Sequence, residues 1–557
     1  MNDVLSRLPP ELSFKFLLLL SGTDLTRLSM TNKHLHDLIC RTPAIQYHMS
    51  LDLNGLRDNP LDTQPLTTRL PLLYDYVVRW RTLTFRSNTT LLRDDFALFR
   101  DAFFQRQEKG NAWTTAPLAR EIAHAAVYSW EEQMIMLDGA PVYIDHVALD
   151  AAADLLVLVE RRSPPGAVGH YLNFDYARET VGLRFHLRSL SSRAEKAHPD
   201  CTHSVLDFNF VYNMNYFSVS TQIVGKKLLV SVSPGFLEAH RETTYYAGMW
   251  DWERGEVLLN ISGLDVPFSE GQFFFLTPDL LLVLSRVVRK DEAIASSAVH
   301  ILDLTSTGES DWEIRTGTKH ALSLCLPHLA PRTILRGRVI SGPIAPQACT
   351  AFIPDPNERL LVFGFGIRMT TGARLRCSIA LAVKQHTIED ILSKHTTTDV
   401  ISHEARKNAL FSSAVIVPWD EWGPTHTRAF VLHSNNIAST SIPDYAVYGS
   451  RAVLSTGTPR NPGITHVVDF SAPNGSSMTI PASTGSDTLA ASDGVAVREP
   501  TVLEFPGLLQ GALTTALPYW AVQVRVKPHV EKWILGANGI VEVERDRGPC
   551  TISVFSL

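Results

Sequence analysis

The feature that most limits how this chain can fold is a leucine-rich stretch near its start, residues 8–39. Apolar residues recur there at helical spacing after Pro9-Pro10, and proline is tolerated in the first turn of a helix because its missing N–H loses no partner. Residues 21–24, Ser-Gly-Thr-Asp, interrupt the periodicity and offer a hydroxyl that can cap a second helix, which resumes from Leu25. A third short apolar run ends the stretch, so the pattern predicts three short helices.

Three helices in about forty residues bury too little apolar surface to be comfortably stable alone. The surplus of leucine therefore predicts an exposed apolar face that a partner protein covers. The alternative is that residues 12–21, LSFKFLLLLS, form an ordinary core helix of a larger helical domain. Periodicity alone does not separate these two interpretations.

The order of the motifs in this stretch resembles an F-box. Leu8-Pro9-Pro10-Glu11-Leu12 is similar to the opening motif of that family. Asp24-Leu25 and Arg27-Leu28-Ser29 are similar to its middle, and Lys33 and Leu35 are similar to its end. The motifs occur in the family order, which favours an F-box over a core helix.

The resemblance implies that this module binds the adaptor Skp1, and through it a cullin, in an SCF-type E3 ubiquitin ligase. The remainder of the chain would then select an unknown protein substrate. Thr31 and Asn32 stand where the family usually has a valine and a cysteine, so the last docking contacts depart from the family pattern. The Skp1-binding residues that the resemblance implies are Leu8, Pro9, Leu12, Phe16, Leu17, Leu20, Leu25, Leu28, Asn32, Leu35 and Leu38.

The composition argues against several kinds of partner. The formal net charge of -6 gives no basic face for nucleic acid, and the six cysteines form no CxxC pair of the kind that binds zinc. No apolar run is long enough to span a bilayer. We therefore expect reduced thiols, a location in the cytoplasm, the nucleus or both, and no cofactor, metal, nucleic-acid or membrane partner. His34, His36 and His48 lie near the module and are interpreted as solvated helix residues.

A second helical pattern follows the module. Leu66, Leu70, Leu73, Val77 and Trp80 alternate steps of four and three, which is the spacing of one helix face. We expect this helix to lie with its apolar stripe against the rest of the chain. It would then fix the angle at which the leading module is held.

After Thr82 the sequence changes to short runs of Val, Leu, Phe and Tyr between glycine, proline and polar turns, which is typical of β-strands. A weak repeat places a polar turn before the apolar run Leu-Leu-Val at residues 155–157, 228–230, 281–283 and 360–362. The next β-like run after each ends at Asp175, Asp251, Asp303 and Val383. Continuous apolar strands fit a β-propeller, whose sheets are packed on both faces by neighbouring blades.

The fold class that we predict is α+β and multidomain. It comprises a three-helix F-box at residues 1–45, a helical linker at 46–82 and a large all-β propeller at 83–557, with about seven blades and six to eight possible. The irregular spacing of the repeat also fits an array of β-sandwiches. The final strand, Thr551–Phe555, could pair with an early strand and close the ring.

Later phrases resemble one F-box family that is abundant in mushroom-forming fungi and whose C-terminal region is interpreted as a propeller. The phrases are QYHMSL (46–51), RLPLLYDYVVRWRTLTF (69–85), VPWDEWGPTHTRAF (417–430), YGSRAV (448–453), VVDF (467–470) and ALPYWAV (516–522). The resemblance thus extends over most of the chain.

The strongest local enzyme signatures are absent, including Gly-x-Ser-x-Gly, the phosphate-binding Gly-rich loop and His-Glu-x-x-His. We therefore predict a non-catalytic subunit, the substrate receptor of the ligase. The alternatives are a non-degradative interaction scaffold and, less favoured, an enzyme whose active site lies in the propeller channel. Arginines near 286–290, 332–338 and 368–376 could bind a phosphorylated substrate, but each group also fits a solvated loop, so no substrate-binding residue is assigned.

Overall fold

The computed structural model describes residues 9–556 with internal gaps. The gaps are residues 61, 85–86, 94–95, 100–101, 107–112, 118–132, 151–152, 163–178, 193–195, 213–216, 235–244, 265–271, 289–294, 305–318, 329, 331–332, 343, 345–350, 370–375, 397–414, 433–445, 459–460, 472–493, 507, 525–529, 537–538 and 545–549.

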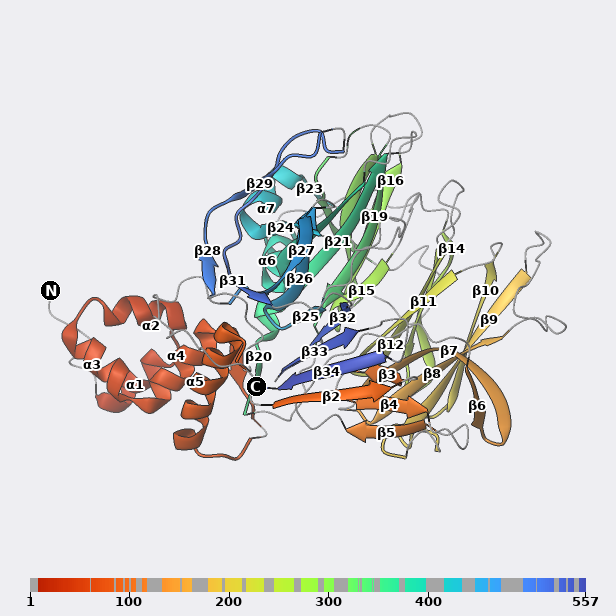
Figure 1. Ribbon diagram of the computed structural model, residues 1–557, viewed down its shortest axis with the longest axis horizontal. Coiled ribbons are helices and arrows are strands. Elements are labelled where there is room, and N and C mark those ends of the chain that lie inside the picture. Colours follow the sequence, from red (N-terminus) through yellow and green to blue (C-terminus); the bar gives the residue numbers. More distant parts are fainter. Residues whose placement is uncertain are drawn as a thin grey trace.

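Helices gather at the N-terminal end of the chain, and two more lie among the strands (Figure 1). They are α1 (Pro10–Leu17), α2 (Gly22–Ser29), α3 (Lys33–Arg41), α4 (Pro43–Leu53), α5 (Leu66–Thr82), α6 (Gln385–Thr396) and α7 (Trp419–His426), with a short 3-10 helix, η2 (Pro356–Glu358). The three helices predicted at the start of the chain are confirmed. Helix α4 packs on α2 and α3 and completes a four-helix bundle at one end of the molecule's long axis (Figure 1).

The rest of the described chain is mostly β-strand in several antiparallel sheets. The first sheet contains β6 (Gln133–Leu137), β7 (Ala140–Asp150), β8 (Leu155–Arg162), β9 (Glu179–Ser189) and β10 (Val205–Tyr212). The second contains β11 (Phe217–Val224), β12 (Lys227–Pro234), β13 (Tyr245–Asp251) and β14 (Glu256–Leu264). The third contains β15 (Gln272–Thr277), β16 (Leu280–Val288), β17 (Ala295–Asp303), β18 (Lys319–Cys325) and, parallel to β18, β23 (Val415–Val417).

A larger sheet follows, with nine strands. It contains β19 (Thr333–Ser341), β21 (Leu360–Met369), β22 (Arg376–Lys384), β24 (Thr427–Leu432), β25 (Ala446–Tyr448), β26 (Arg451–Thr458), β27 (Asn461–Asp469), β28 (Val495–Val497) and β31 (Tyr519–Val524). The small sheets are β1 (Leu56–Asp58) with β20 (Phe352–Pro354), β3 (Phe96–Phe99) with β4 (Ala102–Arg106) and β5 (Trp113–Pro117), and β29 (Thr501–Leu503) with β30 (Leu513–Thr515).

One sheet joins the two ends of the strand-rich region. Strand β2 (Ser87–Arg93) pairs with β34 (Cys550–Ser556), which is followed by β33 (Gly539–Glu544) and β32 (Val530–Leu535) (Figure 1). The predicted pairing of the final strand with an early strand is therefore confirmed. No closed propeller is detected among the described strands, so the ring and its number of blades stay predictions.

The four Leu-Leu-Val runs lie in β8, β12, β16 and β21, and all of their residues are buried. Each of these strands forms a hairpin with the next, in which Asp251 lies opposite Lys227 and Asp303 lies opposite Leu280. Asp175 is outside the described residues, and Ser189 takes the corresponding position opposite Leu155. The repeat is therefore a repeated β-hairpin.

The sheets pack face to face in chain order. In β12, Leu228 and Val230 belong to the core shared with β8–β10, whereas Leu229 belongs to the core shared with β15 and β16. Side chains alternate between the two faces of a strand, so a strand between two sheets must be apolar at every position. This packing accounts for the continuous apolar runs in the sequence.

Helix α5 connects the bundle to the sheets. Leu73, Val77 and Trp80 are buried, and Leu66 and Leu70 pack against the same core. That core also includes residues of α4 and of strands β25–β27 and β31–β34. The predicted apolar stripe and its contact with the rest of the chain are confirmed. None of the described helices is both long and apolar enough to cross a membrane.

Candidate functional site

Side-chain caps determine where the short helices of the bundle begin. The Ser21 hydroxyl accepts a hydrogen bond from the Asp24 N–H at 3.1 Å and caps α2, as the sequence predicted. Asn32 caps α3, since its Oδ1 accepts a hydrogen bond from the His34 N–H at 2.8 Å. The departure from the family pattern at Asn32 therefore has a structural use, because the residue starts the third helix.

The bundle has a small core of its own. Leu17, Leu25 and Ile39 are almost completely buried together with Ile45 of α4. Leu35 is also buried. Of the residues implied to bind Skp1, Leu17, Leu25 and Leu35 therefore hold the helices together, and direct contact of their side chains with a partner stays a prediction.

Large apolar side chains are exposed along α1 and the turn that follows it. Leu12 is 52% exposed, Phe16 is 41% exposed and Leu19 is 85% exposed, and Pro9 is exposed at the start of the helix. Leu12 and Phe16 are four residues apart and therefore lie on one side of α1, with Pro9 at its N-cap and Leu19 in the turn after it. We call Pro9, Leu12, Phe16 and Leu19 the α1 apolar stripe. The described part of the chain does not cover it.

The other implied docking residues lie between these two groups. Leu20, Leu28 and Leu38 are half-buried against the bundle core, and Asn32 is half-buried at its cap. Leu8 is outside the described residues.

Two exposed apolar residues are not among the docking residues that the resemblance implied. Leu19 belongs to the α1 apolar stripe, and Met30, at the end of α2, is 76% exposed. Their apolar character was visible in the sequence. Their exposure depends on where α1 and α2 end, and helix ends are the least certain part of a periodic pattern.

Charges on the bundle are mostly solvated. Lys33, His34 and His36 are exposed on α3, and the Arg27–Asp24 pair at 3.3 Å is exposed on α2. The prediction that His48 is solvated as well is wrong, because His48 is half-buried and its Nε2 lies 3.0 Å from the Leu20 carbonyl oxygen. Such exposed ion pairs contribute little to stability. No group of three potential metal ligands lies together among the described residues, near these histidines or elsewhere.

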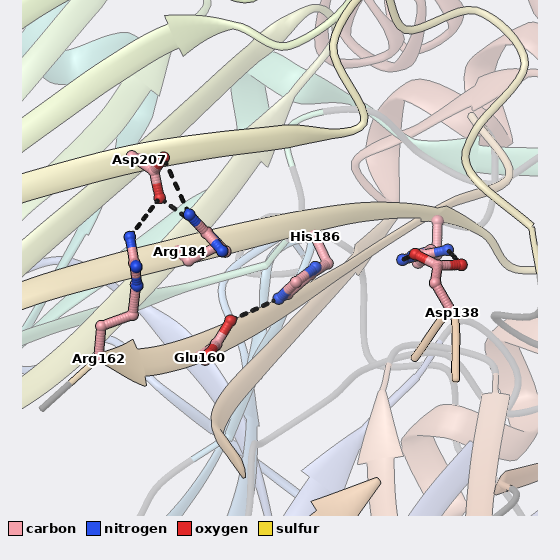
Figure 2. Close-up of polar contacts among 7 residues, drawn as sticks. Asp138, Glu160, Arg162, Arg184, His186 and Asp207 are labelled. Atoms are coloured by element: carbon pink, nitrogen blue, oxygen red, sulfur yellow. Dashed lines mark hydrogen bonds and ion pairs between the residues drawn. The ribbon is translucent and has the colours of Figure 1, made fainter. Parts of the chain in front are cut away.

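A second cluster of titratable side chains lies on sheet β6–β10 (Figure 2). Asp207 accepts a hydrogen bond from Arg184 Nε at 2.9 Å and forms an ion pair with Arg162 at 3.9 Å. Asp138 accepts two hydrogen bonds from Arg188, at 3.0 and 2.5 Å. The hydrogen bonds from Arg188 lower the pKa of Asp138, although partial burial opposes that shift.

The same cluster contains a histidine–carboxylate pair, the kind of group that acid–base catalysis uses. His186 Nε2 lies 2.9 Å from Glu160 Oε2, and burial lowers the pKa of His186 although Glu160 acts in the opposite direction. Glu160 and Arg184 are also opposite each other in register. The cluster is thus a row of cross-strand ion pairs, and we assign it no catalytic role.

The arginine groups considered for phosphate binding are only partly described. Arg289, Arg332 and Arg374 lie in gaps, and Arg368 and Arg376 are opposite each other on β21 and β22. The tryptophans of α7 are core residues, since Trp419 and Trp422 are both buried against β18 and neighbouring strands. No substrate-contact residue is assigned from the arginine groups or from these tryptophans.

Comparison with known families places a recognised domain on this bundle. A model of the F-box domain matches residues 5–44. No curated protein matches the chain. The chain therefore carries an F-box domain, which implies binding to Skp1 and a general role as a substrate adaptor in SCF ubiquitin ligases. F-box proteins are typically non-catalytic ligase subunits, no catalytic domain is found, and the type of the C-terminal domain is not identified.

Proposed function

We propose that this chain is the substrate-recognition subunit of an SCF-type E3 ubiquitin ligase, with its F-box on Skp1 and its strand-rich region on a protein substrate. The observation that carries the proposal is the α1 apolar stripe. Large apolar side chains exposed together on a small domain cost free energy in water, and a partner surface removes that cost. The proposed contact with Skp1 also includes residues next to the stripe, which are Leu20, Leu28, Leu38 and Met30.

The strand-rich region is proposed to be a propeller-like substrate receptor. Three features support this: the hairpins repeat, neighbouring sheets share cores in chain order, and β34 pairs with β2 at the other end of the region. Pairing of the first and last strands removes two exposed sheet edges. We further propose that the protein acts in the cytoplasm, the nucleus or both.

The docking surface is tested with Leu12→Ala combined with Phe16→Ala in the full chain. Interface leucines and aromatics that are truncated cost about 1–2 kcal/mol or more each, so Skp1 affinity should fall by a factor of ten or more. Affinity is measured by titrating purified Skp1, and circular dichroism checks that the helices remain folded. Unchanged affinity in the folded double variant would reject this docking surface.

A matched control removes equally exposed apolar side chains from the strand-rich region. Ile416 is 62% exposed and Val495 is 60% exposed, so Ile416→Ala with Val495→Ala removes similar apolar surface far from the bundle in sequence. This variant should bind Skp1 like the wild type. A loss equal to that of the α1 variant would show that the effect is not specific to the F-box.

A scaffold that binds Skp1 without directing degradation would pass the docking test. The two functions separate when proteins captured by the full chain are followed after the chain is removed. If the chain is a substrate receptor, removing it lengthens the half-life of at least one captured protein. Adding back a chain that lacks residues 1–45 then does not restore the shorter half-life. No change in any half-life favours the scaffold.

A further inference from the structure

A buried arginine lies where α5, the helix that connects the F-box bundle to the sheets, contacts the strands. Arg451, the first residue of β26, is 4% exposed. Its Nε donates to Asp469 Oδ2 at 2.9 Å, and one terminal nitrogen donates to the Tyr76 hydroxyl at 2.9 Å. The guanidinium also lies 5.3 Å from the centre of the Tyr76 ring and 4.7 Å from that of Trp80. One cation therefore binds a carboxylate on β27 and two aromatic side chains on α5.

Asp469 is held in place by several further donors. Its Oδ1 accepts from the Ser450 hydroxyl at 2.9 Å, and from the Ser471 hydroxyl and N–H at 2.7 and 3.0 Å. Burial opposes ionisation, but Arg451 and Ser471 hold the pKa of Asp469 below its usual value. The carboxylate is therefore charged at neutral pH and fixes the position of Arg451.

Arg81 connects the same network to the bundle. It lies on α5, and one of its terminal nitrogens donates to Asn54 Oδ1, at the end of α4, at 3.2 Å. Burial lowers the pKa of Arg81, and the charge of Asp469 acts against that shift. The network thus includes α4, α5, β26 and β27.

A second attachment is made by the segment between α4 and α5. Strand β1 pairs with β20, and Arg57 forms an ion pair with Asp355 at 2.8 Å. The Asp355 N–H also donates to the Gly55 carbonyl at 2.8 Å. Gly55 has a φ of +61°, and a side chain there would meet Glu358 and Ser471 at about 3 Å, so only glycine allows this close approach.

From these contacts we propose that Arg451 is a positioning residue, which locks the F-box bundle and the strand-rich region into one rigid unit. The consequence for ligase activity rests on the proposed function, because a substrate on the strand-rich region would then be presented at a fixed distance and angle from Skp1. The bundle contacts the sheets through both α5 and β1. Two separate attachments prevent the pivoting that is expected between domains joined by a single small contact.

Removing the arginine takes one partner from each of two buried groups, the Asp469 carboxylate and the Tyr76 hydroxyl. Arg451→Met would retain much of the side-chain volume but would remove the cation beside Asp469 and the hydrogen bond from Arg451 to the Tyr76 hydroxyl. The free-energy cost of these lost interactions falls if α5 moves away from β26, because water can then reach both groups. A wider range of bundle orientations is therefore the expected result.

Orientation is measured in the full chain as the distance between two spin labels. One label goes on the exposed Cys40 of α3, the other on Ile416→Cys of β23, and the remaining five cysteines are changed to alanine. The parent chain should give one narrow distance distribution. Arg451→Met should broaden it at least about twofold, and Tyr76→Phe, which keeps the ring and removes only the hydroxyl, should broaden it less.

Arg254→Met is the matched control. Arg254 is largely exposed, and its ion pair with Glu256 is long, at 3.9 Å, so little is lost when it is removed. This variant should leave the distance distribution unchanged. An unchanged narrow distribution in folded Arg451→Met overturns the proposal, and if that variant does not fold, an unchanged distribution in Tyr76→Phe does so. Skp1 affinity is measured on the same variants and should stay at the parent value. If the proposed Skp1 docking is wrong, the Skp1 affinities show it. If the proposed rigid attachment through Arg451 is wrong, the label distances show it, so the two outcomes are distinguishable.

Discussion

The F-box bundle and the strand-rich region differ in how completely their apolar side chains are buried. The bundle buries Leu17, Leu25, Ile39 and Ile45 but leaves large apolar side chains exposed on α1. In the sheets the apolar runs are covered on both faces by neighbouring sheets. Exposed large apolar residues in the described strands, such as Ile416 and Val502, occur singly on different strands.

The comparison shows that exposed apolar surface has a different meaning in each region. Single exposed apolar side chains on a large β structure are normal and need no partner. The same kind of side chain repeated along one short helix, over a core of four residues, indicates an incomplete structure that a partner completes.

The largest expected effect is in the core between sheets. Phe185 is completely buried and its ring centre lies 5.4 Å from that of Trp250 on the next sheet. Phe185→Ala should lower the free energy of unfolding of the strand-rich region by about 3–5 kcal/mol, because it leaves a cavity that the sheets cannot fill. Urea unfolding followed by tryptophan fluorescence measures this loss.

Skp1 affinity of Phe185→Ala, measured under conditions where the variant is folded, serves as its control. The bundle core shares no residue with the core around Phe185, so the affinity should not change. A parallel loss of affinity would show that the two cores are coupled.

A smaller loss is expected in the bundle. Leu25 is completely buried, and Leu25→Ala should cost about 2–3 kcal/mol, the lower part of the usual range, because so small a core can collapse around the cavity. Amide hydrogen exchange should become faster in α1–α3 and stay unchanged in β6–β18. Saturating Skp1 should restore part of the protection, since a partner that binds only the folded bundle stabilises it.

The smallest effect is a pH dependence of the strand-rich region. Burial lowers the pKa of His186, so the unfolded chain binds a proton more readily than the folded chain. Stability is therefore complete above the unfolded pKa, about 6.5, and falls as the pH drops below it. Urea midpoints measured between pH 8 and pH 5 should decline less in His186→Gln than in the wild type. An identical decline in both would show that His186 does not contribute.

Local patterns in the sequence predicted local structure well. The spacing of Leu73, Val77 and Trp80 identified the buried face of α5, and the hydroxyl of Ser21 identified the start of α2. The Leu-Leu-Val runs identified strands covered on both faces. These predictions succeeded because helix periodicity, capping and strand alternation depend on residues only a few positions apart.

The candidate site was predicted only in part. The sequence identified the F-box, yet it did not separate Leu17 and Leu25, which hold the bundle together, from Leu12 and Phe16, which are exposed. All four are apolar residues in one short stretch. Their different exposure follows from which face of each short helix packs into the shared core of α1–α4, and that packing is not visible in the F-box sequence alone.

The sequence by itself determined a leucine-rich helical module, a connecting amphipathic helix and a long series of apolar strands, because each depends on neighbouring residues. Only the tertiary structure decided which leucines face water and how the module is attached. Arg451 and Tyr76 are 375 positions apart and meet at one hydrogen bond. A pairing across that separation leaves no local pattern, since it is set by the packing of α5 on strands formed by the last part of the chain.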